Sequence, residues 1–177
     1  MDGLVTLLPE PFYKQVQDLW DELEARFDLR GVRITPFPHF SWQVAQNYDP
    51  VLLVDRLNQL THQLHSFKVR TAGLGLFTSE HPTLFIPVVK SPQLVTFHEQ
   101  IWQTLEGTAS NLDAYYTPDA FVPHITLAFA DLTNEKAGQV MEWLSKDGFN
   151  WEMQVDNLTY IHQPSGGIGQ VTHQVKF

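Results

Sequence analysis

Pro38-His-Phe-Ser-Trp-Gln-Val-Ala45 and Pro123-His-Ile-Thr-Leu-Ala-Phe-Ala130 are two octapeptides with one shared pattern. Proline, histidine and the final alanine coincide, and Ser41 of the first stretch corresponds to Thr126 of the second. The two histidines lie 85 residues apart (124 − 39), a spacing too long for an array of small repeats. The match therefore predicts two halves of one architecture, related by a pseudo-two-fold axis.

The alternation within each stretch predicts a β-strand with one polar and one apolar face. In a strand, residues i and i+2 share a face and lie roughly 6.6 Å apart. His39 therefore shares a face with Ser41, and His124 shares one with Thr126. The intervening residues are expected to face a core: Phe40, Trp42 and Val44 in the first run, and Ile125, Leu127 and Phe129 in the second. If the two strands lie side by side, the four polar side chains converge on one spot.

The rest of the chain mixes helices and strands without a regular βαβ rhythm. Apolar residues at steps of three and four predict helices over about 12–27, 50–64, 91–105 and 133–146. Runs rich in β-forming residues predict strands over 3–8, 67–77, 83–90, 149–162 and 169–177. This order favours an α+β fold with antiparallel sheets. We expect one bilobal domain over residues 1–177, with two pseudo-symmetric antiparallel sheets, outer helices and a central groove.

Composition narrows the classes of function. The chain has no cysteine, which excludes disulfides, thiolate catalysis and cysteine-ligated zinc. The N-terminus does not resemble a signal peptide and no apolar run is long enough for a membrane span, so we expect a cytoplasmic protein. Eleven Lys and Arg against 20 Asp and Glu give a formal charge of -9. Binding of long nucleic acid needs a basic surplus, so the expected substrate is small or is one end of a polymer.

Two histidines with two hydroxyls suit the cleavage of a phosphodiester. One imidazole can deprotonate the nucleophile and the other can protonate the leaving oxygen, because the unperturbed pKa of histidine is about 6.5. The hydroxyls of Ser41 and Thr126 can donate hydrogen bonds to the non-bridging phosphate oxygens. This chemistry needs no metal.

The paired motifs and the order of helices and strands resemble those of the 2H phosphoesterases. That family includes the 2′-5′ RNA ligase family and cyclic nucleotide phosphodiesterases. The resemblance implies His39 and His124 as the acid–base pair and Ser41 and Thr126 as phosphate ligands. It also implies a bilobal fold with no cofactor, and substrates with a 2′,3′-cyclic phosphate or a 2′-5′ linkage. Ser41 replaces the more common threonine, and Trp42 is larger than the usual aliphatic residue.

The leading hypothesis is hydrolysis of 2′,3′-cyclic phosphates by a monomer without membrane partners. The alternatives are a 2′-5′ phosphodiester hydrolase or RNA ligase that uses the same residues, and a non-catalytic module that binds nucleotides or RNA ends. Phe37 and Tyr116 are candidates for stacking on a base. Arg33 and Lys90 are candidates for further phosphate contacts. His62 and His65 lack a third ligand for a metal, and His81 could reach the groove from a turn.

Overall fold

The computed structural model describes all residues 1–177 and contains ten strands and four α-helices. The strands are β1 (Asp2–Leu7), β2 (His39–Tyr48), β3 (Phe67–Arg70), β4 (Gly75–Phe77), β5 (Thr83–Pro87), β6 (Ala109–Leu112), β7 (His124–Ala128), β8 (Glu152–Val155), β9 (Asn157–His162) and β10 (Gln170–Lys176). The helices are α1 (Phe12–Phe27), α2 (Pro50–Thr61), α3 (Pro92–Thr104) and α4 (Asn134–Leu144), with 3₁₀ turns η1 (Gly31–Ile34) and η2 (Ala114–Tyr116).

Three of the four α-helices begin at a residue whose side chain caps them. The Asp49 side chain accepts hydrogen bonds from the first backbone N–H groups of α2, and Ser91 and Thr133 do the same for α3 and α4. These side chains satisfy N–H groups that lack a partner within the helix. Each helix then buries one apolar stripe, which in α1 consists of Val16, Trp20 and Leu23.

All strand pairs are antiparallel, which confirms the expected α+β fold with antiparallel sheets. Eight strands form one sheet in the order β10-β9-β1-β2-β7-β5-β4, with β6 paired to β2, and β3 pairs with β8 in a separate two-stranded sheet. The large sheet is two half-sheets joined by β2 and β7. Their ladder contains a single register pair, Phe40 opposite Ile125.

The topology repeats after about 80 residues. The first half runs β1-α1-β2-α2-β3-β4, and the second runs β5-α3-β7-α4-β8-β9. The halves exchange strands, because β4 of the first half pairs with β5 of the second, and β9 of the second pairs with β1 of the first. The pairs β2–β7 and β3–β8 each unite equivalent strands, so the pseudo-two-fold axis passes between them.

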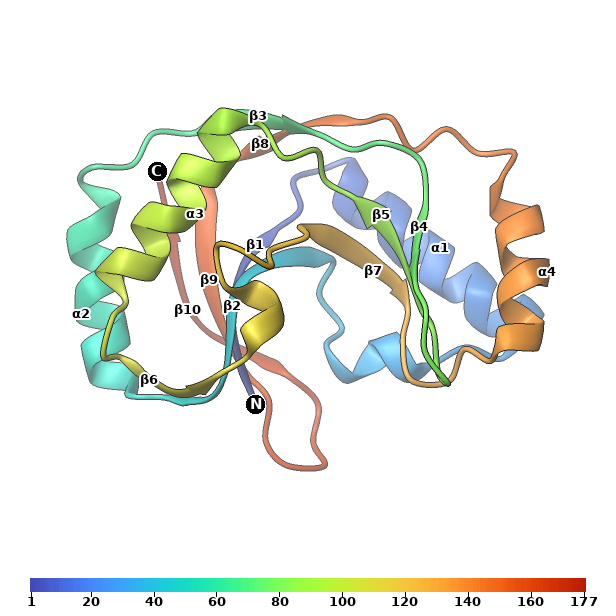
Figure 1. Cartoon of the computed structure of the whole chain (residues 1–177), viewed down its shortest axis with the longest axis horizontal. Helices are drawn as coiled ribbons and strands as arrows, with labels where there is room; N and C mark the ends of the chain where they lie inside the picture. Colours follow the sequence, from blue (N-terminus) through green and yellow to red (C-terminus); the bar gives the residue numbers. More distant parts are fainter.

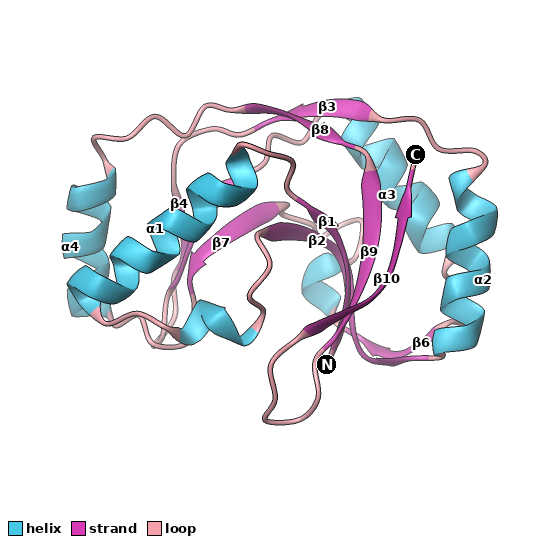
Figure 2. Ribbon diagram, turned by 180° about the vertical axis from the view of Figure 1, so that it is seen from behind, coloured by secondary structure: helices cyan, strands magenta, loops and turns pink.

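Two helices also pack against a strand of the opposite half. Helix α1 contacts β7 and α3 contacts β2, each behind the histidine strand of the opposite half. Figure 1 shows α2 and α3 at one end of the molecule and α1 and α4 at the other, with β3 and β8 along the edge that connects them. The view from behind agrees (Figure 2). A single cluster of 38 buried residues runs through both ends and includes Phe40, Trp42, Ile125 and Leu127.

Two β-rich runs each divide between the two sheets. Residues 67–77 form β3 and β4, separated by Gly73, whose φ of 64° bends the chain. Residues 149–162 form β8 and β9, separated by Asp156. Strand β6 and turn η2 lie in a segment for which the sequence predicts only a loop. A pattern of apolar residues marks extended chain, but it does not say which neighbour each part will find.

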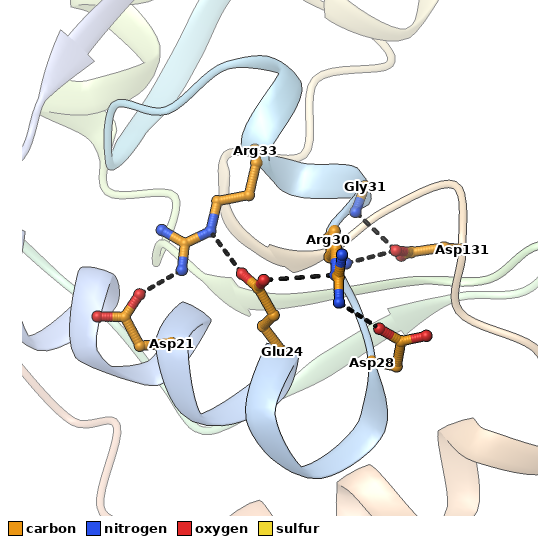
Figure 3. A network of polar contacts seen from close by, with 7 residues as sticks. All are labelled: Asp21, Glu24, Asp28, Arg30, Gly31, Arg33 and Asp131. Atoms are coloured by element: carbon orange, nitrogen blue, oxygen red, sulfur yellow. Dashed lines mark hydrogen bonds and ion pairs between the residues drawn. The ribbon is translucent and has the colours of Figure 1, made fainter.

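A polar network joins the segment before β2 to the segment after β7 (Figure 3). One carboxylate oxygen of Asp131 accepts hydrogen bonds from the backbone N–H groups of Arg30 and Gly31. Arg33 forms ion pairs with Asp21 and Glu24 of α1. The network holds η1 against the segment that follows β7. Because η1 leads into β2, the network connects the two strands that carry the histidines.

Gly31 allows this close approach, and its replacement tests the contact. A Cβ atom at Gly31 would lie 1.8 Å from the Phe129 carbonyl oxygen, a backbone atom that cannot easily move aside. We expect Gly31→Ala to lower the free energy of unfolding by about 1–3 kcal/mol or more. Gly138→Ala is the matched control, because that glycine lies in α4 with nothing within 4 Å of the added Cβ. It should stabilise the fold by roughly 0.5–1 kcal/mol. Urea denaturation of both variants measures the difference, and equal stabilities would contradict the assigned contact.

Candidate active site

The four residues singled out by the sequence lie on one face of two neighbouring strands. With Phe40 opposite Ile125 in an antiparallel ladder, His39 is opposite Thr126 and Ser41 is opposite His124. All four are partly exposed, whereas Phe40 and Ile125 between them are buried at 1% and 0% exposure. The two histidines are diagonal neighbours, for which the backbone separation is about 7–8 Å. The structure therefore brings two imidazoles and two hydroxyls together in a two-by-two patch.

Each strand carries a β-bulge directly after its hydroxyl residue. Against β1, the register shifts between Leu4 and Val5, which leaves Trp42 as the extra residue. Against β5, it shifts between Leu84 and Phe85, which leaves Leu127 as the extra residue. A bulge reverses the facing of the residues that follow it.

The bulges correct two expectations from strict alternation. Val44 was expected to face the core but is half-buried, and Gln43 and Ala45 are buried instead. Phe129 was also expected in the core but lies beyond β7 and is 46% exposed, while Ala128 is buried. The core assignments of Phe40, Trp42, Ile125 and Leu127, which come before or at the bulges, are confirmed.

The two imidazoles are oriented in the same way. Nδ1 of His39 lies 2.5 Å from the Phe37 carbonyl oxygen, and Nδ1 of His124 lies 2.7 Å from the Val122 carbonyl oxygen. A carbonyl can only accept, so Nδ1 carries the proton in both rings. Each Nε2 is then available to accept or donate a proton. In both rings, the bond to a carbonyl two residues upstream fixes the tautomer.

The backbone before each histidine is held in an equivalent way. The Leu8 N–H donates to the Pro38 carbonyl at 3.0 Å, and the Val88 N–H donates to the Pro123 carbonyl at 2.9 Å. Leu8 follows β1 and Val88 follows β5, so these are matching bonds in the two halves. The shared proline before each histidine thus has a shared structural position.

Burial shifts both histidines toward the neutral form. It lowers the pKa of His39, the bond to the Phe37 carbonyl opposes the shift, and the nearby His124 lowers the pKa further. Burial also lowers the pKa of His124, and its bond to the Val122 carbonyl opposes that shift. Near pH 7 the free protein therefore presents two neutral imidazoles, each with an unprotonated Nε2.

Helices α1 and α3 support the strands from behind through hydrogen bonds that the sequence did not reveal. The Trp20 indole N–H of α1 donates to the Thr126 carbonyl at 3.1 Å. From α3, His98 Nε2 and the Trp102 indole N–H both lie within bonding distance of the Trp42 carbonyl, at 2.8 and 3.2 Å. That carbonyl belongs to the bulge residue, whose pairing along the strand is interrupted. Burial lowers the pKa of His98 to about 4, so it is a neutral structural donor.

Two phenylalanines beside His124 were also missed. The Phe77 and Phe85 rings lie 5.0 and 5.1 Å from the His124 ring, centroid to centroid. Phe77 was hidden in a run interpreted as one strand, and its proximity depends on the pairing of β4 with β5. The aromatic residues chosen from the sequence lie beside the first motif and not beside His124: Phe37 precedes β2 and supplies the carbonyl for His39, and the partly buried Tyr116 lies beside Ser41.

No hydrogen bond, ion pair or ring contact joins the remaining candidates to this patch. Arg33 is paired with acidic residues of α1, and Lys90 lies 5.9 Å from the centre of the Phe121 ring. His62, His65 and His81 are exposed. No three His, Asp or Glu side chains gather as a metal site would require, and no helix is long and apolar enough to cross a membrane. Two surface hollows, one beside Arg56 and Glu106 and the other beside Glu10 and Asp156, are lined by none of the four patch residues.

Solved structures share this fold over the whole chain. Protein TT0787 of Thermus thermophilus superposes with a TM-score of 0.67 at 15% identity, covering 99% of this chain and 96% of that one. A second structure, described as that of a phosphoesterase, gives a TM-score of 0.58 at 13% identity and covers 99% and 97%. At these identities the likeness concerns the fold.

Sequence comparison identifies relatives and a family. Proteins of Bacillus cereus strains B4264 and G9842, both named putative phosphoesterases, are 24% and 23% identical over 161 residues, which cover 89% of this chain and 88% of theirs. Residues 8–167 match the family described as the 2′-5′ RNA ligase superfamily, and this range includes both histidine motifs. The chain therefore belongs to the 2′-5′ RNA ligase superfamily, the 2H phosphoesterases that its paired motifs resemble.

Proposed function

We propose that this protein hydrolyses 2′,3′-cyclic phosphates at the ends of nucleotides or short oligonucleotides, without a metal ion. Membership of a superfamily of 2H phosphoesterases supports phosphoesterase activity in general. The observation that carries the finer proposal is the two-by-two patch, in which His39 and Ser41 oppose Thr126 and His124 across one ladder. Two histidines that are diagonal neighbours on one face can flank a single phosphate group.

The reaction is an in-line displacement at phosphorus. A water oxygen forms a bond to phosphorus while the bond from phosphorus to one ribose oxygen breaks. The Nε2 atom of one histidine takes the proton from water, and the Nε2–H of the other gives a proton to the departing ribose oxygen. The products are a phosphomonoester and a free ribose hydroxyl, and the two histidines exchange protonation states.

The two hydroxyls fit the role of phosphate ligands. Ser41 and Thr126 occupy the other two corners of the patch, so their hydroxyls can reach the non-bridging oxygens from both strands. The backbone beneath them is fixed by the adjacent bulges and, at Thr126, by the Trp20 indole. Donors that are held in place before the reaction stabilise the charge of the transition state without a cost of reorganisation.

The first prediction concerns the histidines. His39→Ala and His124→Ala should each lower kcat for 2′,3′-cyclic nucleotides by roughly 10²–10⁴-fold, as expected for loss of a general acid or base. His62→Ala is the control, because His62 is exposed at the end of α2 and should leave the rate unchanged. Assays contain EDTA throughout. Wild-type activity in both patch variants would refute the proposal, and saturable nucleotide binding without any turnover would favour a binding module.

The second prediction concerns pH. The general base must be neutral, so the rate rises as pH increases through the pKa of the base. The general acid must be protonated, so the rate falls as pH increases through the pKa of the acid. Since both pKa values are lowered in the free protein, both limbs of the kcat/KM profile should move to acid pH, with an optimum below about 6.5. A bound phosphate anion favours the imidazolium, so the kcat optimum should lie at higher pH. A kcat/KM optimum near pH 8 would contradict this assignment.

The third prediction concerns the hydroxyls. Ser41→Ala and Thr126→Val should each lower kcat by roughly 10²-fold, the effect of removing one donor to transition-state charge. Ser41→Thr and Thr126→Ser keep a hydroxyl at the same backbone position and should keep most of the activity. Steady-state kinetics on one cyclic nucleotide separates the pairs. If the conservative variants lose as much as the others, the role is packing and not hydrogen bonding.

The family description favours one alternative, a 2′-5′ phosphodiester hydrolase or ligase that uses the same four residues. Such an enzyme would place the same acid–base pair around an acyclic linkage. Product analysis on 2′-5′-linked dinucleotides, beside the cyclic substrates, distinguishes the two activities.

A further inference from the structure

Aromatic rings of the flanking strands contact His124 but not His39, which breaks the pseudo-symmetry of the patch. Beside the second motif, Phe85 lies opposite Thr126, and Gly75 lies opposite Phe85. At the equivalent positions beside the first motif, Val5 lies opposite Ser41, and Thr159 lies opposite Val5. Val5 and Thr159 are buried at 1% and 0% exposure and offer no aromatic surface. The wall beside His124 is therefore a feature of this half alone.

The aromatic wall consists of Phe77 and Phe85, and Gly75 makes room for it. The two phenylalanine rings lie 4.2 Å apart, and both contact the His124 ring. A Cβ atom at Gly75 would lie 2.3 Å from the Phe85 ring, so the bare glycine lets that ring lie over the neighbouring strand. Phe85 is 5% exposed, so most of its ring is covered. Phe77 keeps 38% exposure beside His124.

A partly exposed phenylalanine next to a reactive imidazole is suited to bind a flat group of the substrate. Stacking of a nucleobase on an aromatic side chain is favourable by about 1–3 kcal/mol and tolerates any base. On the opposite side, the position that corresponds to Phe77 in register is Ile161, which pairs with Gly3 and is 3% exposed. Only the His124 side therefore presents an open ring from the sheet itself.

We infer that Phe77 binds the base of the substrate nucleoside, which makes His124 the general acid and His39 the general base. This inference rests on the proposed hydrolysis. In an in-line displacement, the attacking water and the leaving oxygen lie on opposite sides of phosphorus. The leaving oxygen belongs to the same nucleoside as the base, so a base on Phe77 places that oxygen beside His124. The water then enters on the side of His39.

The first test separates stacking from general damage. Phe77→Leu should raise KM for 2′,3′-cyclic nucleotides by about 5- to 100-fold and leave KM unchanged for the abasic substrate methyl riboside 2′,3′-cyclic phosphate. Phe129→Leu is the matched control, because that ring is also exposed, at 46%, but lies beyond β7. It should affect neither substrate. Equal effects of Phe77→Leu on both substrates would overturn the stacking role.

The second test determines which histidine is the general acid and which is the general base. A 4-nitrophenolate leaving group departs without protonation, so methyl 4-nitrophenyl phosphate does not need the general acid. His124→Ala should lose far less activity on this ester than on a cyclic nucleotide, whereas His39→Ala should lose about as much on both. The assignment would be overturned if His39→Ala were the variant that keeps activity on the nitrophenyl ester, or if both variants lost equal activity on it. Either result would leave the proposed hydrolysis standing. If the wild-type protein turns over none of these diesters, the proposed function itself fails.

Discussion

The two halves of the sheet meet at one register pair, Phe40 opposite Ile125, and the position of every candidate catalytic atom depends on that contact. A shift of one residue between β2 and β7 would turn His39 or His124 to the opposite face, because side chains alternate along a strand. A ladder of one pair has little strength of its own. The register is held by its surroundings: Phe40 and Ile125 are buried in the shared core, and α1 and α3 each bind the strand of the other half.

The electrostatics of the patch follow from the same arrangement. Partial burial lowers the pKa of both imidazoles, and the acidic charge of the whole chain gives no field that would attract polyanions. Under the proposed function, affinity for phosphate must therefore come from directed hydrogen bonds within the patch. Once one anion is bound, its charge favours the protonated form of one histidine, which creates the acid at the moment when the acid is needed. The proposed site would therefore take one small phosphate diester more readily than a long nucleic acid.

The sequence predicted the elements that depend on local patterns. The four helices, the capping residues Ser91 and Thr133, and the two histidine strands could be predicted because periodicity and caps are short-range signals. The pairing of the four polar side chains was predicted only on the condition that the strands lie side by side. The structure meets that condition through exchanged strands, such as β4 with β5, which no local pattern encodes.

The parts that sequence analysis missed share one physical cause, since each depends on a contact between distant segments. The bulges at Trp42 and Leu127 arise where β1 and β5 set the register, and they turned Val44 and Phe129 away from the expected core. His98 had no patterned partner because its acceptor, the Trp42 carbonyl, lies 56 residues away. Phe77 was hidden for the same reason.

The pseudo-symmetric fold supplies two equivalent histidines, whereas the proposed reaction needs two histidines in different protonation states. A duplicated strand readily supplies two equivalent imidazoles, yet a displacement at phosphorus needs one base and one acid, which differ in protonation. A perfectly symmetric patch would bind a phosphate in two orientations with equal ease, and half of the complexes would place water where the leaving group should be. Any side chain that favours one orientation therefore contributes to the rate through positioning, even without touching phosphorus. Phe77 and Phe85 contact His124, whereas the equivalent positions in the other half carry Ile161 and Val5, so under the proposed function this pair favours one orientation of the substrate.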